Sequence, residues 1–138
     1  MIILDTNVIS EPLRKAPDPR VVEWIDAQNI ETLYLAAVSV GELRHGVAAM
    51  PDGRRRDVLA EQLEDRILPL FVGRVLAYDL EATAKYARLM SGARAAGLAI
   101  GTADGMIAAT AAAAGFTVAT RDTAPFEAAG VPIIDPWQ

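Results

Sequence analysis

Residues 1–7 read MIILDTN, and this short stretch decides the fold that the sequence predicts. Met1 to Leu4 is a continuous apolar run, and continuous rather than alternating apolarity is typical of a strand that is buried on both faces. Asp5 then places a carboxylate directly after the strand. Because ligands bind beyond the carboxyl ends of strands in open parallel sheets, this opening predicts a polar site at the end of a buried parallel strand.

Strands of the same buried type alternate with helical patterns along the rest of the chain. Further strands are predicted at residues 32–38, 74–78, 116–119 and 131–134. Helices are predicted to begin near residues 18, 39, 54, 79, 102 and 126. Alternating strands and helices predict a three-layer α/β/α fold with a mainly parallel central sheet. No linker or internal repeat interrupts the pattern, so residues 1–138 are expected to form a single domain.

Local signals mark several of the predicted helix ends. The spacing of Ser39 and Glu42 is that of a capping box, in which each residue satisfies a free backbone N–H of the other. Asp79 and Thr102 are expected to be the N-caps of the next two long helices. Gly115 is expected to close the alanine-rich helix that begins near Thr102.

The composition excludes several kinds of chemistry. Without cysteine there is no disulfide, thiolate nucleophile or cysteine-ligated metal. The single histidine, His45, cannot supply the two-histidine acid-base pair of metal-free ribonucleases or a multi-histidine zinc site, and no GxSxG elbow is present. His45 is expected to be a solvated helix residue.

Charge and hydropathy bear on the partners and the compartment. A net charge of -5 argues against binding nucleic acid by bulk attraction, although all but two of the 13 basic residues are arginine, the better phosphate ligand. The apolar run before Asp5 is too short for a secretion signal, and no run approaches the roughly 20 residues that span a membrane. A cytoplasmic protein without membrane contact is therefore expected.

Four carboxylates are predicted to meet at one edge of the sheet. Asp5 ends the first strand, Glu42 lies in the first turn after the second, Asp104 lies in the first turn of the alanine-rich helix, and Asp122 follows the fourth strand. Each like-charge pair at about 4 Å costs on the order of 4 kcal/mol at an effective dielectric constant near 20. Oxygen ligands without histidine or cysteine favour Mg²⁺ or Mn²⁺ as the neutralising cation.

Each of these acids also has an ordinary structural explanation. Asp5 and Asp122 are common turn residues, Glu42 fits the capping box, and Asp104 would favour a helix N-terminus through the helix dipole. Taken singly the signals are weak, and it is their predicted position at a common edge that favours a functional site.

The motifs around the acids resemble those of PIN-domain nucleases. The residues that match the four family signatures are Asp5, Thr6, Asn7 and Val8; Glu42, Leu43 and Gly46; Asp104, Ile107, Ala108, Ala109 and Ala111; and Thr120, Arg121, Asp122 and Phe126. The resemblance runs from Met1 to Trp137. Within the family it is nearest to the VapC and FitB branch of toxin-antitoxin ribonucleases.

The resemblance implies metal-dependent hydrolysis of RNA by an activated water, leaving 5′-phosphate and 3′-hydroxyl ends. It implies Mg²⁺, with Mn²⁺ as a substitute, held by four catalytic carboxylates: Asp5 and Asp104 foremost, then Glu42 and Asp122. Many toxins of this type have Asn in place of Asp122 and an acid in place of Pro125. Whether Asp122 contacts the metal directly or through water, and whether one or two ions bind, therefore stays open.

Three neighbouring residues are given supporting roles. Asn7 is expected to orient Asp5, and the Thr120 hydroxyl to hold a water or a carboxylate, although both are equally compatible with local turn hydrogen bonds. Arg121 is a candidate contact for an RNA phosphate. The basic run at residues 54–56 is a second candidate for RNA or an acidic partner, but a solvated helix start is the preferred interpretation.

The resemblance also implies partners. Toxins of this branch resemble one another in forming homodimers and in being silenced by a small DNA-binding antitoxin, which places a basic side chain in the acidic pocket. An acidic rim would attract such a side chain. Trp24, Phe71 and Trp137 are candidates for the apolar groove that an antitoxin needs, with core packing as the default expectation.

Two other classes of function remain as alternatives. A Mg²⁺-dependent phosphatase or receiver-like protein also gathers acids at the edge of a parallel sheet, but Asn7 stands where a haloacid-dehalogenase-type phosphatase needs its second Asp. A receiver needs an adjacent acidic pair and a later lysine, which are missing. A non-catalytic nucleic-acid or protein interaction module would not need all four acids. Since a metal-activated water makes no use of the 2′-hydroxyl, the preference for RNA over DNA rests on the resemblance alone.

Overall fold

A five-stranded, all-parallel sheet forms the centre of the computed structural model, which describes residues 1–138. The strand order is β3-β2-β1-β4-β5, so the first strand of the chain is the central one. The strands are β1 (Ile2–Leu4), β2 (Leu33–Ala36), β3 (Val75–Leu76), β4 (Thr117–Ala119) and β5 (Ile133–Ile134). The predicted parallel sheet is confirmed. Its strands are shorter than the apolar runs suggested, because those runs continue into neighbouring helices and loops, as at residues 37 and 38.

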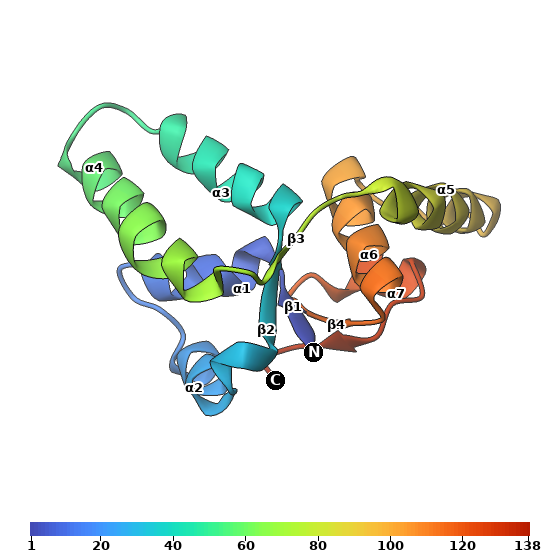
Figure 1. The fold of residues 1–138 in the computed structure, drawn as a ribbon, viewed down its shortest axis with the longest axis horizontal. Coiled ribbons are helices and arrows are strands. Elements are labelled where there is room, and N and C mark those ends of the chain that lie inside the picture. The colour runs from blue at the N-terminus through green and yellow to red at the C-terminus, as the bar shows by residue number, and fades with distance from the viewer.

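Seven α-helices connect the strands and form the two outer layers (Figure 1). They are α1 (Thr6–Ser10), α2 (Pro19–Ala27), α3 (Ala37–Ala48), α4 (Arg54–Glu61), α5 (Leu80–Ala95), α6 (Thr102–Ala114) and α7 (Thr123–Ala128). In Figure 1, α1 to α4 gather on one side of the sheet and α5 to α7 on the other. The three-layer α/β/α architecture is therefore confirmed. No helix combines the length and apolarity needed to cross a membrane.

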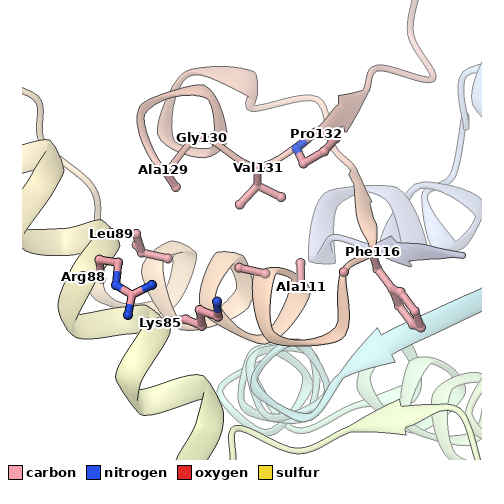
Figure 2. A pocket seen from close by; sticks show the side chains of 11 residues that line it. Lys85, Arg88, Leu89, Ala111, Phe116, Ala129, Gly130, Val131 and Pro132 are labelled. Carbon is pink, nitrogen blue, oxygen red and sulfur yellow. The ribbon is translucent and has the colours of Figure 1, made fainter.

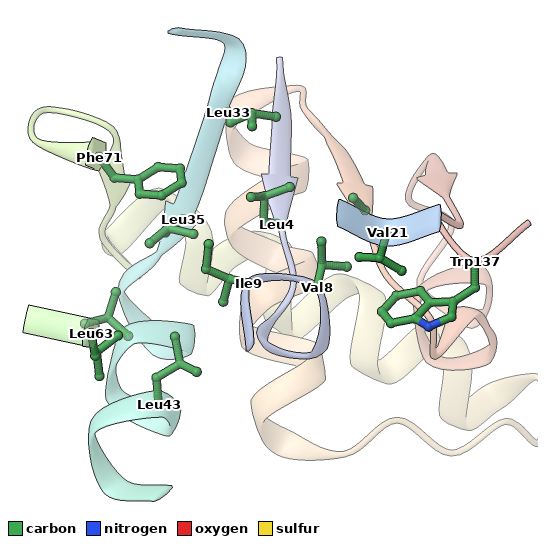
Figure 3. Packing of buried hydrophobic residues seen from close by; sticks show 12 residues of the cluster. Leu4, Val8, Ile9, Val21, Leu33, Leu35, Leu43, Leu63, Phe71 and Trp137 are labelled. Carbon is green, nitrogen blue, oxygen red and sulfur yellow. The ribbon is translucent and has the colours of Figure 1, made fainter. Parts of the chain in front are cut away.

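The side chains on the two faces of the sheet belong to two separate hydrophobic clusters. Leu4 and Leu35 join the cluster beneath α1 to α4, which Figure 3 shows together with Phe71. Ile3 and Val118 point to the other cluster, beneath α6 and α7. Neighbouring residues of β1 thus serve opposite faces, as the period of a strand requires. This explains why the opening stretch is continuously apolar.

The three aromatic residues considered for a partner groove belong to the core. Phe71 is 2% exposed and Trp137 is 7% exposed, and both are members of the cluster beneath α1 to α4. Trp24 is partly buried against the same cluster. The default expectation of core packing is therefore the correct one for all three.

Three of the predicted helix starts are wrong, and one of them is that of α7, which begins at Thr123 rather than near residue 126. The helix α3 begins at Ala37, so the capping box does not exist, and Ser39 is instead buried inside the helix, where its hydroxyl has no hydrogen-bond partner. The N-cap of α6 is Gly101, and Thr102 is its first helical residue. At α3, the chain passes from β2 directly into the helix through Ala36, so the transition from strand to helix is set by tertiary packing and needs no cap.

Other local signals are confirmed, and one helix was missed. Asp79 caps α5 by accepting a hydrogen bond from the Ala82 N–H at 2.9 Å, and Gly115 closes α6 at a positive φ of 72°. The predicted helix from Arg54 is α4, which continues into a π-helical turn. The short helix α1 was not predicted, because five residues are too few to show a helical period.

Candidate active site

The four predicted carboxylates come together at the carboxyl end of the sheet. Asp5 follows β1, Asp122 precedes α7, and Asp104 lies in the first turn of α6. Glu42 lies in the second turn of α3 rather than in the first, because α3 begins earlier than predicted. The charges of Asp104 and Glu42 act on Asp5, and those of Asp122 and Glu42 act on Asp104. The four acids therefore form one electrostatic cluster.

Asp5 is the buried member of the cluster. It is 4% exposed, and both of its carboxylate oxygens accept hydrogen bonds. One oxygen accepts from the Thr6 N–H at 2.8 Å, and the other accepts from the Thr120 hydroxyl at 2.8 Å and the Asn7 amide at 3.4 Å. The Asp5 N–H donates to the Ala119 carbonyl at 2.9 Å. The position and the orientation of this carboxylate are both fixed.

Thr120 ties Asp5 to the loop that carries Asp122. Its fully buried hydroxyl donates to Asp5 and accepts from the Asp122 N–H at 3.1 Å and the Asn7 amide at 3.4 Å. The Asn7 side-chain oxygen in turn accepts from the Arg121 N–H at 3.3 Å. Asn7 and Thr120 thus both contact Asp5 and also hold together the ends of two strands that are far apart in sequence.

Glu42 is held in a different way. Its carboxylate is exposed and accepts one side-chain hydrogen bond, from the Thr6 hydroxyl at 2.7 Å. This contact joins α1 to α3. The sequence identified Thr6 only as part of a motif. Its contact with Glu42 could not be predicted, because it depends on α1, a helix that the sequence did not indicate and that directs Thr6 toward α3.

Burial and like charges raise the pKa of two of the carboxyl groups. Burial raises the pKa of Asp5 from 3.8 to about 6, although hydrogen bonds from Thr120 and the neighbouring backbone act in the opposite direction. The pKa of Asp104 is also raised, first by burial and then by the charges of Asp122 and Glu42. In both groups the charged form is disfavoured in the protein alone, and a bound cation would restore it.

The donor set fits a hard divalent cation. It offers oxygen atoms only, since the chain has no cysteine and His45 is exposed on α3, as predicted. No three acidic or histidine side chains stand close enough together to hold an ion by themselves. Mg²⁺ usually binds proteins through one or two carboxylates and completes its shell with water and substrate phosphates. A loose group of acids around one fixed carboxylate is compatible with that mode of binding.

Close packing of α5 on α6 positions Asp104. The next residue, Gly105, faces α5, and a Cβ atom at this position would lie 2.7 Å from the Met90 sulfur and 3.1 Å from the Tyr86 ring. Only a residue without a side chain lets the two helices approach this closely without displacing their side chains. The first turn of α6, which carries Asp104, is therefore placed by contacts with α5.

The candidate basic residues lie around the site but are partly engaged elsewhere. Arg121 is next to the cluster through its backbone, and its guanidinium lies 5.2 Å from the centre of the Trp137 ring. The basic run at residues 54–56 starts α4, as the preferred interpretation held, and Arg56 forms an ion pair with Asp52.

A parallel sheet in this strand order, with acids gathered at its carboxyl edge, defines a PIN-type domain. The model of the PIN domain family matches residues 2–131, and the chain therefore belongs to that family. It is 60% identical over 138 residues to VapC ribonuclease Y4jK of Sinorhizobium fredii and 59% identical to plasmid stability protein StbB of Pseudomonas syringae pv. tomato. Each comparison covers 100% of this chain and 99% of the relative.

Solved structures agree with this assignment. The crystal structure of FitAcB from Neisseria gonorrhoeae matches with a TM-score of 0.97 at 53% identity, covering 100% of this chain and 99% of that one. The resemblance to the VapC and FitB branch, drawn from the four motifs, is therefore confirmed.

Proposed function

We propose that this protein is a toxin-type endoribonuclease that hydrolyses RNA phosphodiester bonds at the four-carboxylate cluster. The observation that carries the proposal is Asp5, a buried carboxylate with a raised pKa that is fixed by Thr120 at the centre of a group of like charges. The name of the relative Y4jK, a VapC ribonuclease, supports RNA as the substrate.

The proposed cation is Mg²⁺, with Mn²⁺ as a substitute. Asp5 and Asp104 would be its direct ligands, with Glu42 and Asp122 completing the cluster. A bound cation of this kind lowers the pKa of a water molecule and offsets charge on the phosphate. The protein contributes a carboxylate held in one orientation by Thr120 and Asn7, so that little reorganisation is needed when the ion and substrate bind.

The exposed residues around this centre would meet the RNA. Arg121 is the proposed phosphate contact, since its backbone is bonded to Asn7 at the edge of the cluster. Glu42 and Asp122 are both exposed, so they can adjust when a substrate phosphate enters.

The proposed partner is a small DNA-binding antitoxin. A solved relative, FitAB, is described as bound to an IR36 DNA fragment and matches with a TM-score of 0.97. The acidic rim formed by Glu42 and Asp122 would attract a basic side chain of such a partner. We further propose that residues 1–138 act as a single domain and that the toxin works in the cytoplasm as a homodimer.

The decisive experiment is cleavage of labelled RNA by the purified protein. Wild-type protein should cleave with Mg²⁺ or Mn²⁺, leave 5′-phosphate ends, and stop when a chelator is added. Asp5→Asn should lower the rate by at least about a hundredfold, because it replaces the fixed carboxylate that binds the cation. Lys15→Gln, an exposed substitution away from the cluster, is the matched control and should cleave as the wild type does.

Two results would reject the proposed activity. One is cleavage that persists in chelator or is equal in the Asp5→Asn variant. The other is release of phosphate from a small phosphate ester with no cleavage of RNA, which would indicate the phosphatase alternative. Intact RNA and ester under all conditions would favour the non-catalytic interaction module.

A further inference from the structure

A hollow lies at the edge of the sheet opposite to the carboxylates (Figure 2). Its volume is about 400 Å³, and it is enclosed by α5, the end of α6 and the loop between α7 and β5. Asp104 lies in the first turn of α6, and Gly115 closes the helix at its far end. At 1.5 Å per residue, a helix of this length separates the two sites by roughly 15–20 Å. A molecule in the hollow would not touch the acid cluster.

Two basic side chains are the only charged groups that line the hollow. Lys85 and Arg88 lie three residues apart on one face of α5, and Figure 2 shows both on the same side of the opening. Neither takes part in an ion pair within the chain. No acidic residue lines the hollow, although the chain carries a net charge of -5. The surface is therefore a local positive site on an acidic protein.

The floor and the opposite wall are apolar. Leu89 and Ala111 form part of the floor, and Val131 points into the hollow from the other side (Figure 2). Ala112, the neighbour of Ala111 on α6, also lines the hollow. The alanine side chains fill little of the space above α6. An aliphatic side chain of a ligand can occupy that space and bury apolar surface on both walls.

The backbone of the wall offers little to an anion. The N–H groups of Ala129, Gly130 and Val131 all donate to carbonyl groups of α7. An anion in the hollow must therefore be met by the side chains of Lys85 and Arg88. A ligand that carries an apolar group next to its anionic group would also contact the remaining lining, most of which is apolar.

We propose that this hollow binds a short acidic segment of a partner protein, with an aliphatic side chain on the floor and a carboxylate against Lys85 and Arg88. Single-stranded nucleic acid fits the hollow less well, because such binding relies on aromatic rings that stack with bases. The one aromatic residue of the lining, Phe116, packs against Tyr34 with ring centres 4.8 Å apart. The proposal is independent of the ribonuclease activity, since it involves none of the four acids.

The experiment selects ligands from a phage-displayed library of short random peptides on the full-length protein. Selection on wild type, with counter-selection on the double variant K85E/R88E, should enrich Asp or Glu next to Leu, Ile, Val or Met. An enriched peptide, labelled with fluorescein, should then bind the double variant at least about tenfold more weakly, because two charge-assisted contacts are lost. Both substitutions are on the surface of α5, and circular dichroism checks that the fold is kept.

Two further variants separate charge from shape. K15E/R54E makes the same change in net charge at exposed positions outside the hollow, and it should bind the peptide as the wild type does. Ala112→Leu fills the floor without changing charge and should also weaken binding.

The outcomes that overturn the proposal are distinct. Failure to enrich acidic peptides would do so, as would equal loss of binding in K15E/R54E. A short single-stranded RNA that binds wild type in chelator, loses binding in K85E/R88E and displaces the peptide would assign the surface to nucleic acid instead. RNA cleavage should be the same in wild type and K85E/R88E, so the result does not depend on the proposed nuclease function.

Discussion

The carboxylate cluster has a buried half, Asp5, and an exposed half, Glu42 and Asp122, and the two halves are held in opposite ways. Asp5 is buried, and both of its oxygens accept hydrogen bonds from groups that are themselves fixed. Glu42 and Asp122 are exposed; Glu42 accepts one side-chain hydrogen bond, and the Asp122 carboxylate accepts none. We infer from this difference that the protein would present Asp5 as a ligand position fixed in advance, whereas Glu42 and Asp122 would be ordered by the cation and the substrate.

Among the substitutions that test this contrast, the largest effect on metal affinity is expected when a hydrogen bond to the buried Asp5 is removed. Thr120→Val removes the hydroxyl that donates to Asp5, and loss of such a supporting contact typically lowers metal affinity by about 10–100-fold. It should also raise the pKa of Asp5 further, so that the activity appears only at higher pH. Calorimetric titration with Mn²⁺ and a pH profile of RNA cleavage would measure both effects, and Thr120→Ser should restore them.

The matched change on the exposed half is Thr6→Val, which removes the hydrogen bond to Glu42. Here the loss of metal affinity should be smaller, and the pH profile should not move. Equal losses in Thr120→Val and Thr6→Val would show that the two halves do not differ as their geometry indicates.

An effect of intermediate size is expected on stability. The pKa of Asp5 rises from 3.8 to about 6 on folding, so the folded protein binds this proton more tightly than the unfolded chain does. The resulting stability is fully present below about pH 4 and is lost as the pH rises through about 6. The shift in pKa corresponds to about 3 kcal/mol of free energy of unfolding. The metal-free protein has this contribution at low pH and has lost it at neutral pH.

Asp5→Asn should therefore stabilise the metal-free protein at pH 7. The gain should be about 1–2 kcal/mol, since the amide also loses a hydrogen bond worth about 1 kcal/mol. At pH 4 the gain should vanish. Urea unfolding in chelator at both pH values would measure it, with Asp122→Asn as the exposed control, for which a change below about 0.5 kcal/mol is expected. A variant that is less stable than wild type at pH 7 would contradict the conclusion that the charged form of Asp5 destabilises the metal-free protein.

The smallest effect is expected at Ser39. This hydroxyl is as deeply buried as that of Thr120, but it has no hydrogen-bond partner. It therefore makes no hydrogen bond to any of the four acids. Ser39→Ala should change the free energy of unfolding by a few tenths of a kcal/mol at most, or raise it, because an unpaired buried polar group is removed. Thermal unfolding would measure this. A clear loss of stability would mean that the hydroxyl has a partner in solution, such as a water molecule.

The sequence predicted the convergence of the four acids better than it predicted the local structure around them. The positions of Asp5 and Asp104 at the carboxyl edge of the sheet could be predicted, because a carboxylate after an apolar strand and one in a first helical turn both have simple positional signals. Glu42 was placed at the wrong point of its helix, since the capping-box spacing from Ser39 imitates a helix start. The resemblance led us to expect that Thr120 holds a water or a carboxylate, and its hydroxyl does donate to Asp5. The contact from Thr6 to Glu42 was not predicted, because it depends on how elements far apart in the chain pack together, which no local pattern encodes.

The central position of the first strand has a consequence for the order of assembly. β1 pairs with β4 through Ile2 and Thr117, and Asp5 meets its hydrogen-bond donor Thr120 across 115 positions of the chain. Contacts so distant in sequence form late, because most of the chain must first be present and loop closure is costly. During synthesis, a nascent chain that has not yet exposed Thr120 carries Asp5 without its partner. The carboxylate cluster can thus be completed only after Thr120 has been made and has left the ribosome, which delays any activity of the centre until β4 has paired with β1.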